Sequence, residues 1–210
     1  MKKKRKLKKK VIVFIIIFIL IILSLVSIFV YKSMTPKNTS TVKVVEKIED
    51  YGYYLEDDQP KIYKELFKEL VTVLKNEKVD YDKYASLISR MAVIDFYNLD
   101  NKVSKNDVGA TQFIREKNKA NFVLQASETV YKYIEQNIYG DREQELPVVK
   151  TVNVINQKTE AYKYKKISDD KAYTFTVGVE YEKDLGYPKE VTVKLLHDGK
   201  KLVIYEMNSN

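Results

Sequence analysis

The stretch KAYTFTVGVEY, residues 171–181, alternates between apolar and polar side chains and therefore predicts a β-strand. Its apolar face would carry Tyr173, Phe175, Val177, Val179 and Tyr181. Threonine, glycine and glutamate would occupy the other face. A strand with one apolar face packs that face on a core and leaves the other to solvent, as antiparallel sheets commonly do.

The same two-residue period extends over the whole chain after Pro147. The stretches VVKTVNVIN (148–156) and AYKYKK (161–166) flank a polar turn and predict two further strands. Two more, VTVKLLH (191–197) and KKLVIYEM (200–207), are joined by Asp198-Gly199, a dipeptide typical of tight hairpins. These patterns together predict an antiparallel sheet of about four strands.

A helical period of 3.6 precedes the strands. It predicts three amphipathic helices, over residues 60–76, 81–97 and 116–138. Acidic residues and Pro60 favour the first helix start, Asp80 is the expected N-cap of the second, and Gly140 is the expected C-cap of the third. Helices that precede a separate antiparallel sheet indicate an α+β domain.

Residues 42–57 fit two secondary structures. Val44, Val45 and Ile48 fit a helical stripe, whereas Tyr51, Tyr53 and Leu55 alternate as in a strand. Gly52 disfavours a continuous helix, so an extended segment near 50–55 is preferred, and the choice between helix and strand for 42–57 stays open.

Residues 11–31 carry no charged side chain, and only Ser24 and Ser27 interrupt their apolar character. As a helix, 21 residues extend about 31 Å, close to the thickness of a bilayer's hydrocarbon core of about 30 Å. The run is longer than the apolar region of a cleaved signal peptide and ends in bulky Phe29-Val30-Tyr31. It predicts an uncleaved signal anchor, followed by a polar linker over 32–41.

The N-terminal tail sets the expected orientation. Its eight basic residues are Lys2, Lys3, Lys4, Arg5, Lys6, Lys8, Lys9 and Lys10. Such residues stay on the cytoplasmic side and lie against anionic lipid headgroups, so 1–10 would be a cytoplasmic tail and 42–210 a domain outside the cytoplasm. Removing these eight from the 37 basic residues leaves 29, equal to the 29 acidic ones, so no nucleic-acid partner is expected for the folded part.

The chain lacks cysteine, so no disulfides are expected and an exported domain must be stable through its core alone. Composition rich in Lys, Ile, Asn and Tyr indicates an A/T-rich bacterial genome, and together with the single anchor it suggests a Gram-positive cell surface. His197, the only histidine, precedes the Asp198-Gly199 turn, where an exposed or structural role is expected. The acidic groups at 56–58 and 169–170 lack the spacing of a calcium loop, so no metal or cofactor is expected.

The order of three helices and then an antiparallel meander resembles the cone-shaped nuclear transport factor 2-like (cystatin-like) fold. Following a basic tail and one membrane span, the domain is similar to the periplasmic assembly component of type IV secretion and to its relatives in Gram-positive conjugation machines. The runs Ile94-Asp95-Phe96-Tyr97 and Ser104-Lys105-Asn106-Asp107-Val108-Gly109 resemble uncharacterised membrane proteins of Gram-positive bacteria. No functional residue is carried over, because no motif aligns residue by residue.

Folds of this kind can hold a ligand between helices and sheet, and ketosteroid isomerase is one enzyme built in this way. The resemblance makes Asp95 the candidate catalytic residue, since a desolvated aspartate would have a raised pKa and could act as a general base. The favoured alternative is structural, with Asp95 hydrogen-bonded to a tyrosine hydroxyl or to the loop that follows it.

Tyrosine is abundant, with 17 residues, and most are expected in or near the core. Five are candidates for an interaction surface: Tyr51, Tyr53, Tyr54, Tyr162 and Tyr164. The sequence therefore predicts a single-pass, non-enzymatic interaction or assembly domain outside the cytoplasm. Its partners would be the bilayer and envelope proteins, or further copies of the chain, in a secretion or conjugation complex. The alternative is a ligand-binding or enzymatic domain that uses a cavity between helices and sheet.

Overall fold

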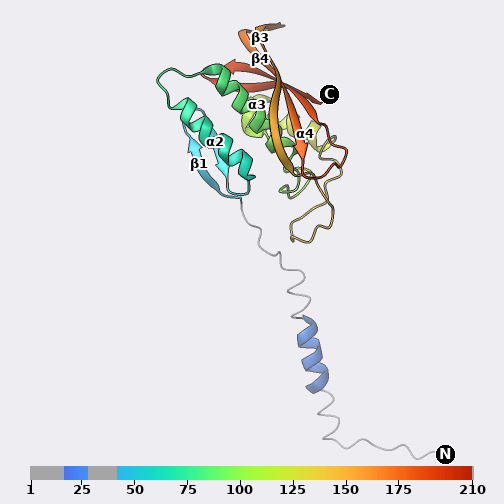
Figure 1. The fold of residues 1–210 in the computed structure, drawn as a ribbon. Coiled ribbons are helices and arrows are strands. Elements are labelled where there is room, and N and C mark those ends of the chain that lie inside the picture. The colour runs from blue at the N-terminus through green and yellow to red at the C-terminus, as the bar shows by residue number, and fades with distance from the viewer. Residues whose placement is uncertain (1–16, 28–41, 210) are drawn as a thin grey trace, which may run out of the picture. The chain divides into compact units, whose positions relative to one another are not determined.

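The computed structural model describes residues 17–27 and 42–209 of the chain (Figure 1). The chain has two compact units. One contains the helical segment 17–27 and residues 138–141, and the other is the α+β domain formed by residues 42–137 and 142–209.

The sheet of the domain has four antiparallel strands, as the alternating pattern predicts. They are β3 (Val149–Tyr164), β4 (Ile167–Tyr181), β5 (Glu190–Asp198) and β6 (Lys201–Ser209), in the spatial order β3-β4-β5-β6. Phe175, Val177 and Val193 are fully buried on the core face, and Asp198 pairs with Lys201 across the predicted hairpin turn. The stretch 171–181 thus lies in β4, a central strand of the sheet.

Strand β3 differs from the prediction of two strands separated by a polar turn. Residues 149–164 form one continuous strand, and the turn lies later, at Lys165-Lys166, where Lys165 has φ +53°. The polar residues near 157–160 belong to a long, exposed part of the β3–β4 hairpin. Polarity there reflects exposure of residues 157–160 on the edge strand β3 and not a chain reversal.

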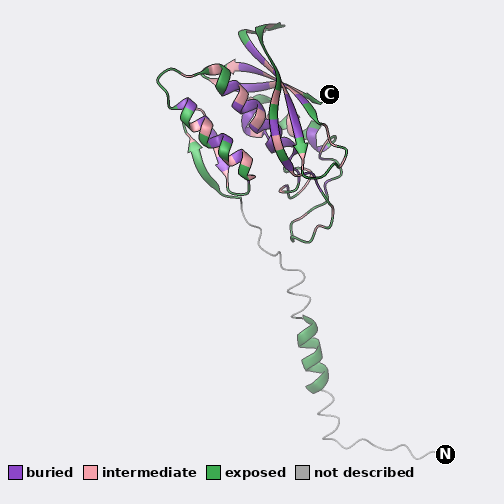
Figure 2. Ribbon diagram, in the orientation of Figure 1, coloured by how far each residue is buried: buried purple, intermediate pink, exposed green. Residues whose placement is uncertain are grey.

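Two of the three predicted helices have nearly the predicted bounds. Helix α2 covers Lys61–Leu74 and helix α3 covers Tyr81–Tyr97, where the Asp80 carboxylate accepts a hydrogen bond from the Lys83 N–H at 3.0 Å. Twelve of the seventeen α3 residues are buried, since this helix packs on the sheet and against α2 (Figure 2). An aspartate that closes the first turn in this way is a strong start signal.

The third helix, α4 (Glu116–Ser127), ends eleven residues before the predicted end at residue 138. At this end the Ser127 hydroxyl donates to the Leu124 carbonyl and the Thr129 hydroxyl to the Gln125 carbonyl, which are local side-chain bonds to the backbone. The chain then turns so that the Tyr131 ring is fully buried. Gly140 is therefore not the C-cap of this helix.

Residues 42–57 contain two strands, β1 (Val44–Ile48) and β2 (Tyr53–Glu56), paired as an antiparallel hairpin separate from the main sheet. Gly52 in the connecting turn has φ +66°, a conformation that glycine adopts without strain. The helical alternative for this segment is wrong.

Residues 17–27 are helical, and the rest of the predicted anchor 11–31, the basic tail 1–10 and the linker 32–41 lie outside the described residues. Within the part of the chain that the structure describes, no helix has both the length and the apolar character needed to cross a membrane.

Candidate functional site

Asp95 lies in the last turn of α3, with only 6% of its surface exposed. Its Oδ1 accepts hydrogen bonds from Gln59 Nε2 and Lys102 Nζ, both at 2.9 Å, and its Oδ2 accepts from the Ala110 N–H at 2.7 Å. These donors come from the start of α2 and from the loop after α3. Asp95 therefore joins three segments of the domain, which agrees with the structural alternative.

The electrostatics of Asp95 are opposite to those of the predicted general base. Burial raises the pKa of the Asp95 carboxyl. The Lys102 ammonium and the hydrogen bonds lower it by a larger amount, so the net pKa lies below its ordinary value. For Lys102, burial lowers the pKa and Asp95 raises it, with a net increase. Both groups are held in their charged forms, and the prediction of a raised pKa for Asp95 is wrong.

The five candidate surface tyrosines do not form one surface. Tyr53 is fully buried, which contradicts its assignment to an exposed patch. Tyr51 stacks on the Tyr53 ring with centroids 6.4 Å apart, and Tyr54 is half-buried. Tyr162 and Tyr164 lie on β3, where Tyr164 is 51% exposed and the Tyr162 ring contacts Tyr205 of β6.

Tyr53 has a structural role at the outer edge of the sheet. Its hydroxyl donates to the Leu202 carbonyl at 2.8 Å and shares a 2.6 Å hydrogen bond with the Tyr84 hydroxyl. The Leu202 N–H in turn donates to the Tyr84 hydroxyl at 3.0 Å. The edge strand β6 thus has both backbone groups of Leu202 satisfied by side chains from the core.

His197 is partly buried and paired, not simply exposed. Its Nδ1 lies 3.0 Å from Asp169 Oδ2, and its backbone N–H donates to the same carboxylate at 2.6 Å. Burial raises the pKa of Asp169. Hydrogen bonds lower it by a larger amount; they come from the backbone N–H groups of His197 and Lys171 and from the His197 imidazole. The net pKa is therefore below the ordinary value. The contact fastens the start of β4 to the end of β5.

The Asp169 contact predicts an acid-sensitive stability. A carboxyl whose pKa is lowered by folding stabilises the protein above its unfolded-state pKa of about 3.9, and this contribution disappears as the pH falls through the lower, folded value. We expect Asp169→Asn to reduce the free energy of unfolding by about 2 kcal/mol at pH 7. Urea unfolding at pH 7 and pH 3 measures this, and an Asp169→Asn deficit that is equally large at pH 3 would contradict the charge-based explanation. Asp170→Asn, on an exposed neighbour, is the matched control.

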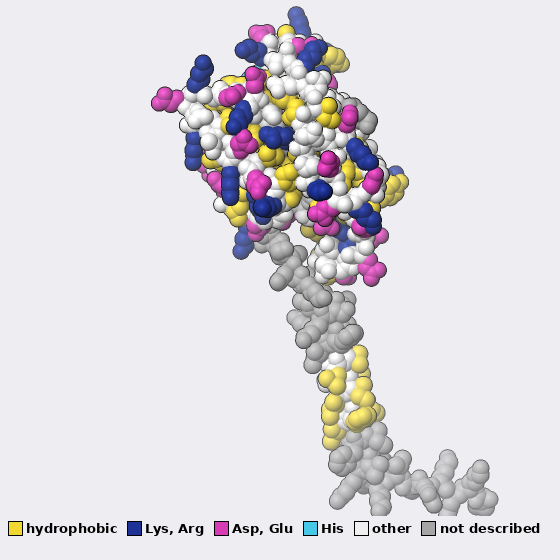
Figure 3. Space-filling view, viewed as in Figure 1, with side chains coloured by type: hydrophobic (Ala, Val, Ile, Leu, Met, Phe, Trp, Pro, Cys, Tyr) yellow, Lys and Arg dark blue, Asp and Glu magenta, His cyan; other side chains and the backbone are white. Residues whose placement is uncertain are grey.

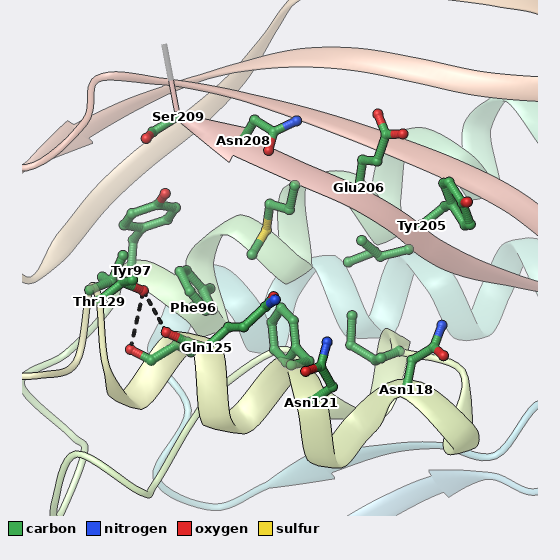
Figure 4. A pocket seen from close by; sticks show the side chains of 16 residues that line it. Phe96, Tyr97, Asn118, Asn121, Gln125, Thr129, Tyr205, Glu206, Asn208 and Ser209 are labelled. Atoms are coloured by element: carbon green, nitrogen blue, oxygen red, sulfur yellow. Dashed lines mark hydrogen bonds between the residues drawn. The ribbon is translucent and has the colours of Figure 1, made fainter.

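A groove of about 710 Å³ lies between α4 and β6, with the C-terminal end of α3 at its base (Figure 4). Asn118, Asn121 and Gln125 line it from α4 and are all exposed. The sequence analysis missed this site, although the signal is visible as uncharged polar residues at positions i, i+3 and i+7 of the helix. The groove contains neither Asp95 nor any of the predicted tyrosines.

The two ends of α4 are fixed, and its middle stands away from the strand. Before the helix, Ile114 forms a parallel bridge with Ile204 of β6, and the Arg115 guanidinium binds the Asp198 carboxylate at 3.0 and 3.3 Å. After the helix, the buried Tyr131 hydroxyl donates to the Phe96 carbonyl at 2.7 Å. Within α4 only Ala126 and Ser127 are buried, so the groove is held open between two fixed points.

The lining of the groove is almost entirely uncharged. Glu206 is the only acidic residue in it, and the described lining has no His, Cys, Asp, Lys or Arg. The Glu206 carboxylate is itself paired with Lys194 Nζ at 3.1 Å. Besides Glu206, the lining carries the hydroxyl groups of Tyr97, Thr129, Tyr205 and Ser209.

Metal binding has no support among residues 17–27 and 42–209, where no group of three or more His, Cys, Asp or Glu side chains is placed to hold an ion.

Comparison with protein-family models, with curated proteins and with solved structures found no match to the chain. The nuclear transport factor 2-like resemblance stays a prediction.

Proposed function

We propose that the protein is a single-pass, membrane-anchored interaction domain that works outside the cytoplasm and recruits an envelope partner through the groove between α4 and β6. The observation that carries the proposal is the lining of that groove. It is open and about 710 Å³ in volume, yet it offers uncharged carboxamides and apolar side chains and only one, already paired, carboxylate. Such a lining favours recognition over chemistry.

The anchor is supported by the helical segment 17–27. Its apolar side chains are exposed, including Phe18 at 64% and Leu25 at 61%, and Figure 3 shows no charged side chain on it. The Ser24 and Ser27 hydroxyls donate to the carbonyls of Ile21 and Leu23, so even the polar groups are satisfied within the helix. A helix of this kind suits a lipid environment, where every polar group needs an internal partner.

The orientation follows from the basic residues of the tail 1–10, which favour a cytoplasmic N-terminus. The domain would then face the outside, where its lack of cysteine and its mixed surface charge suit a free-standing fold. An assembly role in a secretion or conjugation complex is the form of recruitment that the resemblance implies. A small-molecule ligand in the same groove is the alternative, and Asp95 has no part in it because its oxygens are already bonded.

One experiment tests both exposure and recruitment, because the chain has no cysteine. In intact cells, Gln125→Cys places a thiol at the groove and Glu65→Cys places one on the exposed side of α2, 63% exposed in its side chain. A sulfonated, membrane-impermeant maleimide–benzophenone should label both variants, since both thiols would face the outside. After illumination, only the Gln125→Cys variant should give a discrete crosslinked protein product.

The outcomes separate the two parts of the proposal. Labelling only after the cells are permeabilised would overturn the orientation. Efficient labelling without a product specific to Gln125→Cys, or equal products from both positions, would overturn recruitment through the groove.

A further inference from the structure

The outward edge of β6 is closed over its first half and open over its second. Leu202 and Ile204 lie opposite His197 and Leu195 of β5, and their backbone groups face away from that strand. The outward groups of Leu202 bond to Tyr53 and Tyr84, as described above, and Ile204 bridges to Ile114.

Beyond Ile204 the same register places Met207 and Ser209 on the outward edge. They lie opposite Val193 and Val191, which are two and four residues from Leu195 on β5 and so face the same way. On β6 the outward positions shift from Ile204 to Met207 because a bulge adds one residue, Tyr205, between Ile204 and Glu206. Their N–H and C=O groups therefore face the groove. Within the described residues, the Met207 backbone makes no hydrogen bond to a group outside β5.

Across the groove stands the row of carboxamides on α4. Figure 4 shows Asn118, Asn121 and Gln125 on the side of the helix that faces β6. Each carboxamide both donates and accepts hydrogen bonds, as a peptide group does. An extended chain has two edges of peptide groups, so one edge could pair with β6 while the other bonds to this row.

Charge limits the occupant. The only ionised group in the lining, Glu206, is paired with Lys194 and points away from α4 in Figure 4. No counter-charge is thus available for an acidic or basic segment. The aromatic rings at the base of the groove pack against one another, with Phe96 5.6 Å from Phe122 and 5.3 Å from Tyr131.

The wall formed by α4 limits the occupant further. A second copy of the sheet would bring its own neighbouring strands to β6, where α4 already stands. A single extended segment needs no such room. Such a segment would occupy the edge of β6 next to the place where Ile114 already pairs with it in parallel. The chain leaves that edge after Ile114, where α4 begins.

We infer that the groove binds an uncharged, extended polypeptide segment of about five residues, which adds as a strand to β6 over Tyr205–Ser209 and is held on its far side by the α4 carboxamides. Side chains at alternate positions of this segment would be apolar, since the apolar side chains of Met207 and Phe122 line the groove. The inference rests on the proposed recruitment through the groove and names the partner's chemistry.

The test uses the full chain in lipid nanodiscs and a library of seven-residue peptides, capped at both ends. Selected peptides should be uncharged with alternating apolar residues. Asn121→Trp, which fills the groove, should raise the dissociation constant at least about tenfold, whereas Ala120→Trp, on the exposed side of α4 away from the groove, should leave it unchanged. Methylating alternate peptide nitrogens along one edge should also weaken binding about tenfold, because those N–H groups pair with β6. Hydrogen exchange of the Met207 amide should slow when the peptide binds.

Each other result counts against strand addition. Peptides whose binding tolerates N-methylation on either edge, or does not change with Asn121→Trp, would overturn it, as would selection of charged peptides or the absence of any binder. A crosslinked partner at Gln125→Cys combined with such a result would leave the proposed function standing and remove only the strand geometry.

Discussion

Replacing Gly109 with alanine is expected to lower the free energy of unfolding by about 3 kcal/mol or more, because a Cβ at this position has no space. It would lie 1.9 Å from the Asp95 carbonyl oxygen and 2.5 Å from its carbonyl carbon. Both atoms are backbone at the end of α3, so no side-chain rotation relieves the overlap. The Gly109 N–H also donates to the buried Tyr131 hydroxyl, and a shifted loop would break that bond.

Gly186→Ala is the matched control. Gly186 has φ +78°, which strains an alanine by about 1 to 2 kcal/mol, but no atom lies within 4 Å of an added Cβ. At Gly109 the backbone would not strain an alanine, since its φ lies outside the left-handed region, but there is no space for the added Cβ. Urea unfolding of the two variants compares close packing with backbone strain. If Gly109→Ala costs no more than Gly186→Ala, the close approach of the loop to α3 is wrong.

Asp95→Ala is expected to cost about 3 to 5 kcal/mol, because it leaves the Lys102 ammonium buried without its partner. The two side chains are 8% and 6% exposed, so solvent cannot replace the lost interaction. Gln59 Nε2 and the Ala110 N–H lose their acceptor as well. The loop after α3 should loosen from the start of α2.

The double variant Asp95→Ala with Lys102→Met distinguishes an ion pair from simple loss of packing. Removing both charges should destabilise clearly less than the two single variants added together, and denaturant unfolding gives this coupling energy. Glu65→Ala, in the exposed pair with Lys61, should change stability by no more than about 0.5 kcal/mol. Additive effects at Asp95 and Lys102 would contradict a stabilising ion pair between the two side chains.

Much of the fold could be predicted because local patterns agree with the final packing. Asp80 closes the first turn of α3, and the alternation at 171–181 places Phe175 and Val177 in the core, so sequence and structure coincide there. The end of α4 could not be predicted, because it depends on burial of Tyr131 under a loop that is distant in sequence. The continuity of β3 could not be predicted, because a run of polar residues has the same pattern in a turn as in a strand whose two faces are both exposed.

The role of Asp95 and the position of the groove were harder to predict, because both depend on contacts between segments that are distant in sequence. Asp95 on the inner side of a helix carries the same local pattern whether it serves as a base or as half of an ion pair, and Lys102 becomes its partner only when the loop folds back. The groove depends on the separation between α4 and β6, which no local pattern reports. What the sequence does contain is the carboxamide row, and its spacing becomes meaningful only when a free strand edge lies opposite.

The tyrosine hydroxyls at Leu202 also bear on how copies of the chain coexist. Chains anchored in one membrane, as proposed above, would meet at a high effective concentration, and an unprotected strand edge under those conditions templates edge-to-edge association. Tyr53, Tyr84 and the Ile114 bridge close the first half of the β6 edge, and α4 screens the second half from anything as wide as another sheet. The arrangement that leaves room for one partner segment would at the same time keep neighbouring copies from aggregating.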